Sequence, residues 1–227
     1  MLKLNDIAKT FNPGTVNEKK ALDGVKLHLA PGDFVTVVGS NGAGKSTLFH
    51  AIAGVFFPDR GSIVLDGEDI TFKPEYQRSR QLGRLFQDPM KGTAPHMTIE
   101  ENLALAYLRT AKHQHAYFSR TGKADRAFFR DQLARLDMGL EDRMRQPVTL
   151  LMSTMVPPKI LLLDEHTAAL DPGTAEKVLK ITREVVAEHK ITTMMVTHNM
   201  QQALELGNRT LMMDSGSIVL DISGKER

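Results

Sequence analysis

The sequence predicts an α/β protein in which short buried strands alternate with helices. Three short apolar runs have the length and composition of buried parallel strands, and one of them is bounded by Pro31-Gly32 and Gly39. Two segments with helical spacing, 46–53 and 174–189, each follow one of these runs along the chain. The three runs are residues 33–38, 160–163 and 191–197.

The other elements are predicted from alternation, capping and turn residues. Leu2–Ile7 alternates loosely and predicts an edge strand, whereas Ala21–Leu29 alternates regularly and predicts an antiparallel strand. Thr98 with Glu101 three residues later forms a capping-box pattern at the start of a helix. The remaining expected elements are a strand at 62–65, helices at 98–110, 125–136 and 200–206, and a hairpin over 210–221 that turns at Ser215-Gly216.

Composition indicates one globular domain. The chain has 227 residues, 41% of them hydrophobic and 25% charged, and a net charge of +2, so no strong affinity for nucleic acid follows. The absence of cysteine excludes a disulfide scaffold or a thiolate metal site. No apolar stretch approaches the ~20 residues that span a bilayer, and the polar start MLKLNDIAKTFNPG is not a signal peptide. Any link to a membrane is therefore expected to run through a partner.

A glycine-rich segment at residues 39–46, GSNGAGKS, matches the pattern G-x-x-x-x-G-K-[ST] between a predicted strand and a predicted helix. Glycines let successive backbone N–H groups turn toward phosphate oxygens, and the helix that follows adds its positive N-terminal end. Lys45 is expected to reach the terminal phosphates and the Ser46 hydroxyl to bind Mg²⁺. The expected ATP-binding residues of this loop are Gly39, Ser40, Asn41, Gly42, Ala43, Gly44, Lys45, Ser46 and Thr47.

Two carboxylates follow the buried run at 160–163. Ligands of open α/β sheets bind beyond the carboxyl ends of the strands, where Asp164 and Glu165 are expected. Asp164 would hold Mg²⁺ through water, and Glu165 would position or polarise the attacking water. His198 ends the next parallel strand on the same side of the sheet, which could bring it near a γ-phosphate, although a lone histidine is more often structural.

Phe11 and a basic segment have two readings each, and Gln87 has one. Gln87 is by itself an ordinary loop glutamine, and Phe11 is either a core aromatic or a platform for adenine. Residues 109–146 hold nine Lys or Arg and five Asp or Glu. This basic segment is read first as a solvated helical face and second as a docking surface for another protein.

Together these motifs resemble the nucleotide-binding subunit of an ABC transporter over nearly the whole chain. The phosphate loop, the Gln87 loop, LLLDE at 161–165, AALD at 168–171 and VTH at 196–198 stand in the family's order. DEHTAALDP and MTIEENLALA resemble ATPase subunits of bacterial importers near the branched-chain amino-acid group, although His166 stands where many relatives have proline. The resemblance implies a RecA-like P-loop NTPase core, an ABC-type antiparallel β subdomain and a helical subdomain at about 88–157.

The resemblance also implies roles and partners. It implies that Phe11 stacks on adenine, that Gln87 contacts Mg²⁺ and couples to the permease, and that His198 senses the γ-phosphate. Asp171 is implied to communicate across a dimer of ATP-binding subunits. The implied cofactors are ATP and Mg²⁺, and the implied partners are membrane permease subunits and, indirectly, a substrate-binding protein. The implied location is cytoplasmic, peripheral at the inner face of the cell membrane.

One family motif is absent from this sequence. The signature Leu-Ser-Gly-Gly-Gln is expected a little over twenty residues before Asp164, but no Ser-Gly-Gly occurs between Gln87 and Asp164. The simplest account is a gap of roughly ten residues between Val148 and Leu150, just before a helix expected to begin near Thr149. Because each ATP in this family lies between one subunit's phosphate loop and its partner's signature, hydrolysis is expected to suffer more than binding.

The leading interpretation is therefore the ATPase subunit of a bacterial ABC importer. A catalytically impaired or regulatory nucleotide-binding subunit is the alternative, because the signature is missing. A soluble ABC ATPase acting on ribosomes or DNA would carry tandem domains or long insertions, and the chain has neither. A P-loop kinase is disfavoured by the combination of Gln87, AALD and His198.

Overall fold

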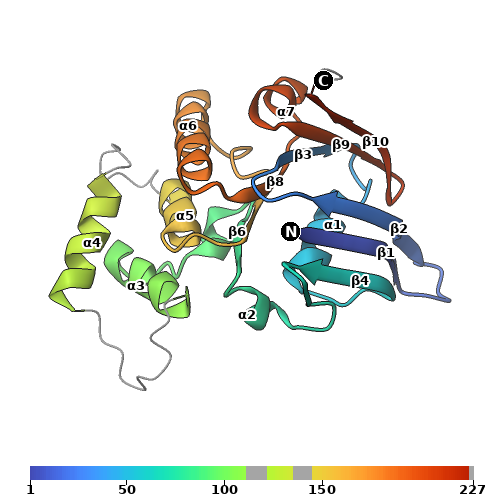
Figure 1. The fold of residues 1–227 in the computed structure, drawn as a ribbon, viewed down its shortest axis with the longest axis horizontal. Coiled ribbons are helices and arrows are strands. Elements are labelled where there is room, and N and C mark those ends of the chain that lie inside the picture. The colour runs from blue at the N-terminus through green and yellow to red at the C-terminus, as the bar shows by residue number, and fades with distance from the viewer. Residues whose placement is uncertain (111–121, 135–144, 225–227) are drawn as a thin grey trace.

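The computed structural model describes residues 1–110, 122–134 and 145–224, which form two sheets and a set of helices (Figure 1). The smaller sheet is antiparallel and has the strand order β2-β1-β4-β5. Because β4 pairs with the free side of β1, β1 lies inside the sheet, and the predicted edge position of this strand is wrong. Its strands are β1 (Leu2–Phe11), β2 (Lys19–Leu29), β4 (Arg60–Leu65) and β5 (Glu68–Asp69).

The larger sheet has six strands in the order β10-β9-β3-β8-β7-β6. The pairs β9–β3, β3–β8, β8–β7 and β7–β6 are parallel, and β10 closes one side as an antiparallel hairpin with β9. All three runs predicted as buried parallel strands lie in this sheet as β3, β7 and β8, which confirms them. The strands are β3 (Phe34–Gly39), β6 (Leu82–Leu85), β7 (Ile160–Asp164), β8 (Thr192–Val196), β9 (Arg209–Asp214) and β10 (Ser217–Ser223).

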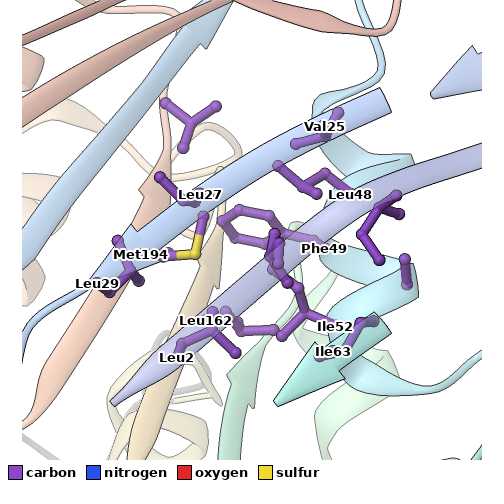
Figure 2. Packing of buried hydrophobic residues seen from close by; sticks show 14 of the residues in the cluster. Leu2, Val25, Leu27, Leu29, Leu48, Phe49, Ile52, Ile63, Leu162 and Met194 are labelled. Atoms are coloured by element: carbon purple, nitrogen blue, oxygen red, sulfur yellow. The ribbon is translucent and has the colours of Figure 1, made fainter. Parts of the chain in front are cut away.

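The main core lies between the two sheets and around α1 (Lys45–Ala53). Figure 2 shows Phe49 of α1 beneath the strands of the smaller sheet, with Leu162 of β7 and Met194 of β8 among its neighbours. All three side chains have no exposed area, as expected for a helix packed between two apolar surfaces. Because α1 is buried in the core, its N-terminus has a fixed position relative to β3. The loop that joins β3 to α1 is therefore held in place at both ends.

The C-terminal end of α1 is held by Arg78 of α2 (Glu75–Arg78). Its guanidinium donates hydrogen bonds to the carbonyl oxygens of Ala51 at 2.7 Å and Ile52 at 2.8 Å, which a helix end leaves unsatisfied. Two more bonds reach Thr71 O and Lys73 O. Burial lowers the pKa of Arg78 to about 10, and the four carbonyls compensate for the buried charge.

The opposite face of the larger sheet is covered by α6 (Pro172–His189), whose apolar side packs on β7 and β8 through Leu179 and Val186. The short helix α7 (Met200–Leu206) packs near β3 and β9. Asp171 caps α6 by accepting a hydrogen bond from the Thr174 N–H at 3.1 Å.

Three further helices pack around a third apolar cluster that includes Leu103, Phe129 and Val148. The capping box is confirmed, because Thr98 Oγ1 accepts from the Glu101 N–H while Glu101 accepts from the Thr98 N–H. The helices are α3 (Ile99–Thr110), α4 (Lys123–Ala134) and α5 (Arg145–Thr154), and a 3-10 turn, η1 (Pro89–Gly92), precedes them. The predicted end of the second helix at 136 lies outside the described residues.

The helix expected to begin near Thr149 begins instead at Arg145, so that prediction is wrong. Pro147 falls in its first turn, where a missing N–H costs nothing. Val148, Thr149 and Leu150 are buried along this continuous helix. Among the helices of the described residues, none has the length and apolar composition needed to cross a membrane.

Candidate nucleotide-binding site

The phosphate loop joins β3 to α1 and depends on glycine at two close approaches. Gly39 and Gly44 have φ of 146° and 101°, which side chains rarely adopt. A Cβ on Gly39 would lie 2.2 Å from Met213 O, and one on Gly44 would lie 2.6 Å from Ala21 O. The backbone of the larger sheet and of β2 therefore closes around this loop, and glycine is required at both positions.

Lys45 is buried within the loop, and its ammonium has no carboxylate partner among the ion pairs of the described residues. Its Nζ donates hydrogen bonds to Gly39 O at 2.8 Å and Ser40 O at 2.9 Å. Carbonyl oxygens solvate a cation without neutralising it, so an anion in the loop would complete the arrangement. Phosphate is the anion for which loop amides, a helix N-terminus and lysine are suited.

Asp164 ends β7 beside Val196 of β8, at the carboxyl edge of the parallel strands. Burial raises the pKa of Asp164, while the nearby charges of Arg84 and Lys45 lower it and that of Glu165 raises it. Ser46, Gln87 and Asp164 line one cavity of about 500 Å³. The structure thus brings together the three residues predicted to bind Mg²⁺, and their hydroxyl, amide and carboxylate oxygens are suitable ligands for that ion.

Glu165 and His198 contact each other directly. His198 Nε2 lies 2.7 Å from Glu165 Oε1, and the two residues line a second cavity of about 210 Å³. Glu165 has φ of 47°, a left-handed conformation, and its N–H donates to Val196 O at 3.2 Å. The turn at the end of β7 therefore points the carboxylate toward the histidine that ends β8. This arrangement can orient a water and accept its proton.

The placement of Phe11 leaves its two readings open. Its ring packs edge-on against Phe56, with centroids 5.3 Å apart, and Lys9 Nζ lies over both rings. Phe11 pairs across the hairpin with Lys19, and Lys19 Nζ lies 3.8 Å from a Cβ placed on Gly42. The end of β1 is therefore near the phosphate loop, as contact with a nucleotide base requires.

Sequence reasoning missed Arg84 and His50, which line the same 500 Å³ cavity as Ser46 and Asp164. His50 lies one helical turn after Ser46 on α1, and burial together with the charges of Arg84 and Lys91 lowers its pKa. Arg84 is a charged residue inside the short strand LGRL. A cation in a buried strand was the available signal for a functional position.

His166 follows Glu165 in the chain and is buried, and burial lowers its pKa to about 4. Its Nε2 lies 3.5 Å from Thr182 Oγ1 of α6, and its Nδ1 has no hydrogen-bond partner. The ring therefore packs as a neutral wedge between the end of β7 and α6.

The fold and the site define a nucleotide-binding P-loop protein with two carboxylates at the end of a parallel strand. A family model described as ABC transporter matches residues 22–168, and the chain belongs to this family. It is accordingly an ATP-binding subunit of the ABC type, in a family whose members hydrolyse ATP.

Relatives and solved structures agree with this assignment. The tyrosine transport ATP-binding protein of Clostridioides difficile (strain R20291) is 38% identical, and the alignment covers all of this chain and 94% of that protein. A methionine import ATP-binding protein of Vibrio vulnificus (strain YJ016) is 31% identical over 96% of this chain and 64% of its own length.

Two solved structures show the same fold. A nucleotide-free ATP-binding cassette from an ABC transporter has a TM-score of 0.81 at 25% identity, covering all of this chain and 92% of that one. A dimeric ATP-binding cassette bound to ADP and Pi has a TM-score of 0.83 at 24% identity, covering 98% of each chain.

Proposed function

We propose that the chain is the ATP-hydrolysing subunit of a bacterial importer and acts on a separate membrane permease. The observation that carries the proposal is the contact between Glu165 and His198, 2.7 Å apart, at the sheet edge that also bears Asp164. Transport and import appear in the names of the relatives above, which supports the importer reading.

Each residue has a distinct task in this proposal. The loop amides and Lys45 hold the phosphates, and Ser46, Asp164 and Gln87 supply oxygen ligands for Mg²⁺. The ion, when bound, neutralises phosphate charge as the γ-phosphate is transferred to water. Glu165 orients the attacking water and accepts its proton, and His198 holds the Glu165 carboxylate in position.

The proposed partners follow from the family. Two ATP-binding subunits, identical or different, form a dimer in which Asp171 communicates across the interface. Permease subunits meet the dimer at the inner face of the membrane, and a substrate-binding protein acts indirectly. Phe11 is proposed to stack on adenine. The relatives differ in the substrate that their names give, tyrosine in one and methionine in another, so we leave the transported substrate unassigned.

The alternative of an impaired or regulatory subunit rests on the missing signature alone. The alignment with the tyrosine transport protein runs over 240 positions, against 227 residues in this chain, so that relative carries residues which this chain lacks. The comparisons give this alternative no support, because the relatives named above are transport or import ATP-binding proteins. Turnover measurements distinguish the two readings.

The test compares ATP binding with phosphate release in the purified protein. Glu165→Gln should keep ATP affinity within about twofold and reduce phosphate release by about 100-fold or more, because the amide cannot accept the proton. Glu176→Gln, an exposed change on α6, is the matched control and should alter neither quantity. Equal rates for Glu165→Gln and the unmodified chain would show that this site does not perform the hydrolysis.

A further inference from the structure

Arg84 is a buried cation whose partners are incomplete. It lies in β6 beside Leu162 of β7, and its side chain is 8% exposed. Burial lowers the pKa of Arg84, and the charges of Asp164 and Glu75 raise it. A buried guanidinium is stable only when acceptors surround it, so the position of this one depends on which acceptors it meets.

The contacts of Arg84 are loose compared with those of Arg78. Its Nη1 lies 3.7 Å from Glu75 Oε1, beyond hydrogen-bond distance, and its Nε is buried without a hydrogen-bond partner. Its guanidinium carbon lies 4.4 Å from the centre of the Phe86 ring. Arg78, in contrast, donates to four backbone carbonyls at 2.7–2.8 Å. Arg84 is therefore packed in place but not locked by hydrogen bonds.

Two cavities meet at Arg84. One, of about 500 Å³, contains Asp164 and Ser46 of the nucleotide site. The other, of about 260 Å³, contains Glu75 and lies between β6 and the helices α3 and α5. Arg84 lines both cavities, and each of them is also lined by a carboxylate, Asp164 in the first and Glu75 in the second.

We propose that Arg84 is a positioning residue shared between Asp164 and Glu75, and that this sharing sets the affinity of the nucleotide site for Mg²⁺. The inference rests on the proposed function, in which Asp164 binds the metal ion. When Arg84 turns toward Asp164, its charge opposes a divalent cation there. When Glu75 attracts Arg84 away from Asp164, the positive charge no longer opposes the metal ion, and Asp164 can bind it.

Lys45, whose charge also lowers the pKa of Asp164, cannot play this role. Lys45 is held by two loop carbonyls at 2.8 and 2.9 Å, so its distance from Asp164 is fixed by the phosphate loop. Arg84 has no comparable anchor among the described residues, and its second carboxylate, Glu75, is half-exposed on a short helix. A change at Glu75 therefore reaches Asp164 through Arg84, and the double variant separates this route from the direct effect of the Glu75 charge.

Opposite shifts from two single substitutions test the proposal. The readout is the Mn²⁺ affinity of the nucleotide-free protein, measured by electron paramagnetic resonance at pH 8, because a nucleotide in solution would itself bind Mn²⁺ and compete with the protein. Arg84→Gln should tighten Mn²⁺ binding by about three- to tenfold, because a repelling charge is removed. Glu75→Gln should weaken it by about twofold or more, because Arg84 then turns to Asp164. The double variant should behave as Arg84→Gln.

The controls separate this inference from the proposed function. Glu205→Gln removes an equally exposed carboxylate from a pair of similar length with Arg183, 3.8 Å apart, and should leave Mn²⁺ affinity unchanged. Asp164→Asn should abolish Mn²⁺ binding; if it does not, the metal assignment fails and the inference fails with it. If Asp164→Asn abolishes binding but Arg84→Gln and Glu75→Gln shift the affinity in the same direction or not at all, Arg84 has no such role and the proposed function stands. Should Arg84→Gln fail to show a cooperative thermal transition, Arg84→Met, which also removes the charge and keeps an unbranched side chain, takes its place in the single and double variants.

Discussion

At the scale of single residues, Lys45 is the charge that the phosphate loop encloses. Lys45→Ala removes the ammonium and should weaken ATP binding by roughly 1.5–3 kcal/mol, the range for a charge-assisted hydrogen bond. Calorimetric titration with ATP measures the change. Lys20→Ala, an exposed lysine paired with Asp23, is the matched control and should bind as the unmodified chain does. Unchanged affinity in Lys45→Ala would contradict the assignment of this loop to phosphate.

His166 predicts a dependence of stability on pH. Its pKa is about 4 in the folded protein and about 6.5 when unfolded, so between these values the unfolded chain binds a proton that the folded chain does not. The free energy of unfolding should therefore fall as pH falls below 6.5, and this residue should account for about 2 kcal/mol between pH 7 and pH 5.

Urea unfolding of the metal-free protein at pH 7 and pH 5 measures the effect, with His166→Gln beside the unmodified chain. The variant replaces the ring by a group that does not titrate, so its loss between the two pH values should be smaller by about 2 kcal/mol. Since other groups titrate in both proteins, only the difference between the two losses belongs to His166. Equal losses would show that the imidazole is not held neutral.

At the scale of secondary-structure elements, the basic segment at 109–146 raises a question about partners. In its described part, Arg126 pairs with Glu100 of α3 at 3.1 Å, and both side chains remain largely exposed. Exposed pairs contribute little to stability, so this charge is available to another protein. Charge reversal at Arg126 and Arg130 should reduce co-purification with the permease subunits severalfold.

The control for that experiment is Lys180→Glu, an exposed reversal on α6 away from α4. Circular dichroism should show that both variants keep their helix content, so a loss of co-purification reflects the surface and not the fold. Co-purification unchanged by the double reversal would return the segment to its first reading, a solvated helical face.

The sequence predicted some of these elements and missed others. Strands β3, β7 and β8 were predicted because each is an apolar run buried on both faces. Asp164 and His198 follow from their positions at or just after strand ends, and Lys45 follows from the glycine-rich motif after β3. Strand β6 was missed, because Gly83 and Arg84 interrupt its apolar pattern. The contact of Arg84 with Glu75 could not be predicted, because it joins two elements whose distance only tertiary packing sets.

At the scale of the whole molecule, the candidate nucleotide site lies at a solvent-exposed edge of the larger sheet. Ser46 and Gln87 are exposed, and His198 is about half-exposed, at 48% of its side chain. We therefore expect this chain to contact the γ-phosphate from one side and a partner to supply the donors on its other side. In the family that partner contributes the signature, which this sequence lacks between Gln87 and Asp164.

The consequence is that this chain alone should hydrolyse ATP slowly, and that donors supplied by a partner should raise its turnover. Removing one preorganised donor typically costs ~10²–10³ in rate, and here the whole set is absent. Inserting Leu-Ser-Gly-Gly-Gln and a few helix-forming residues between Val148 and Thr149 should raise turnover strongly.

Because Val148 and Thr149 are buried within α5, an insertion also risks loosening the apolar cluster of α3, α4 and α5. Leu-Ala-Gly-Gly-Gln followed by the same residues keeps both glycines in the helix but offers no hydroxyl, and it should give a smaller gain. Phosphate release measures both, and Glu165→Gln should abolish the gain if it arises at this site. A chain that already turns over as fast without the insertion would show that the signature is not what completes the site.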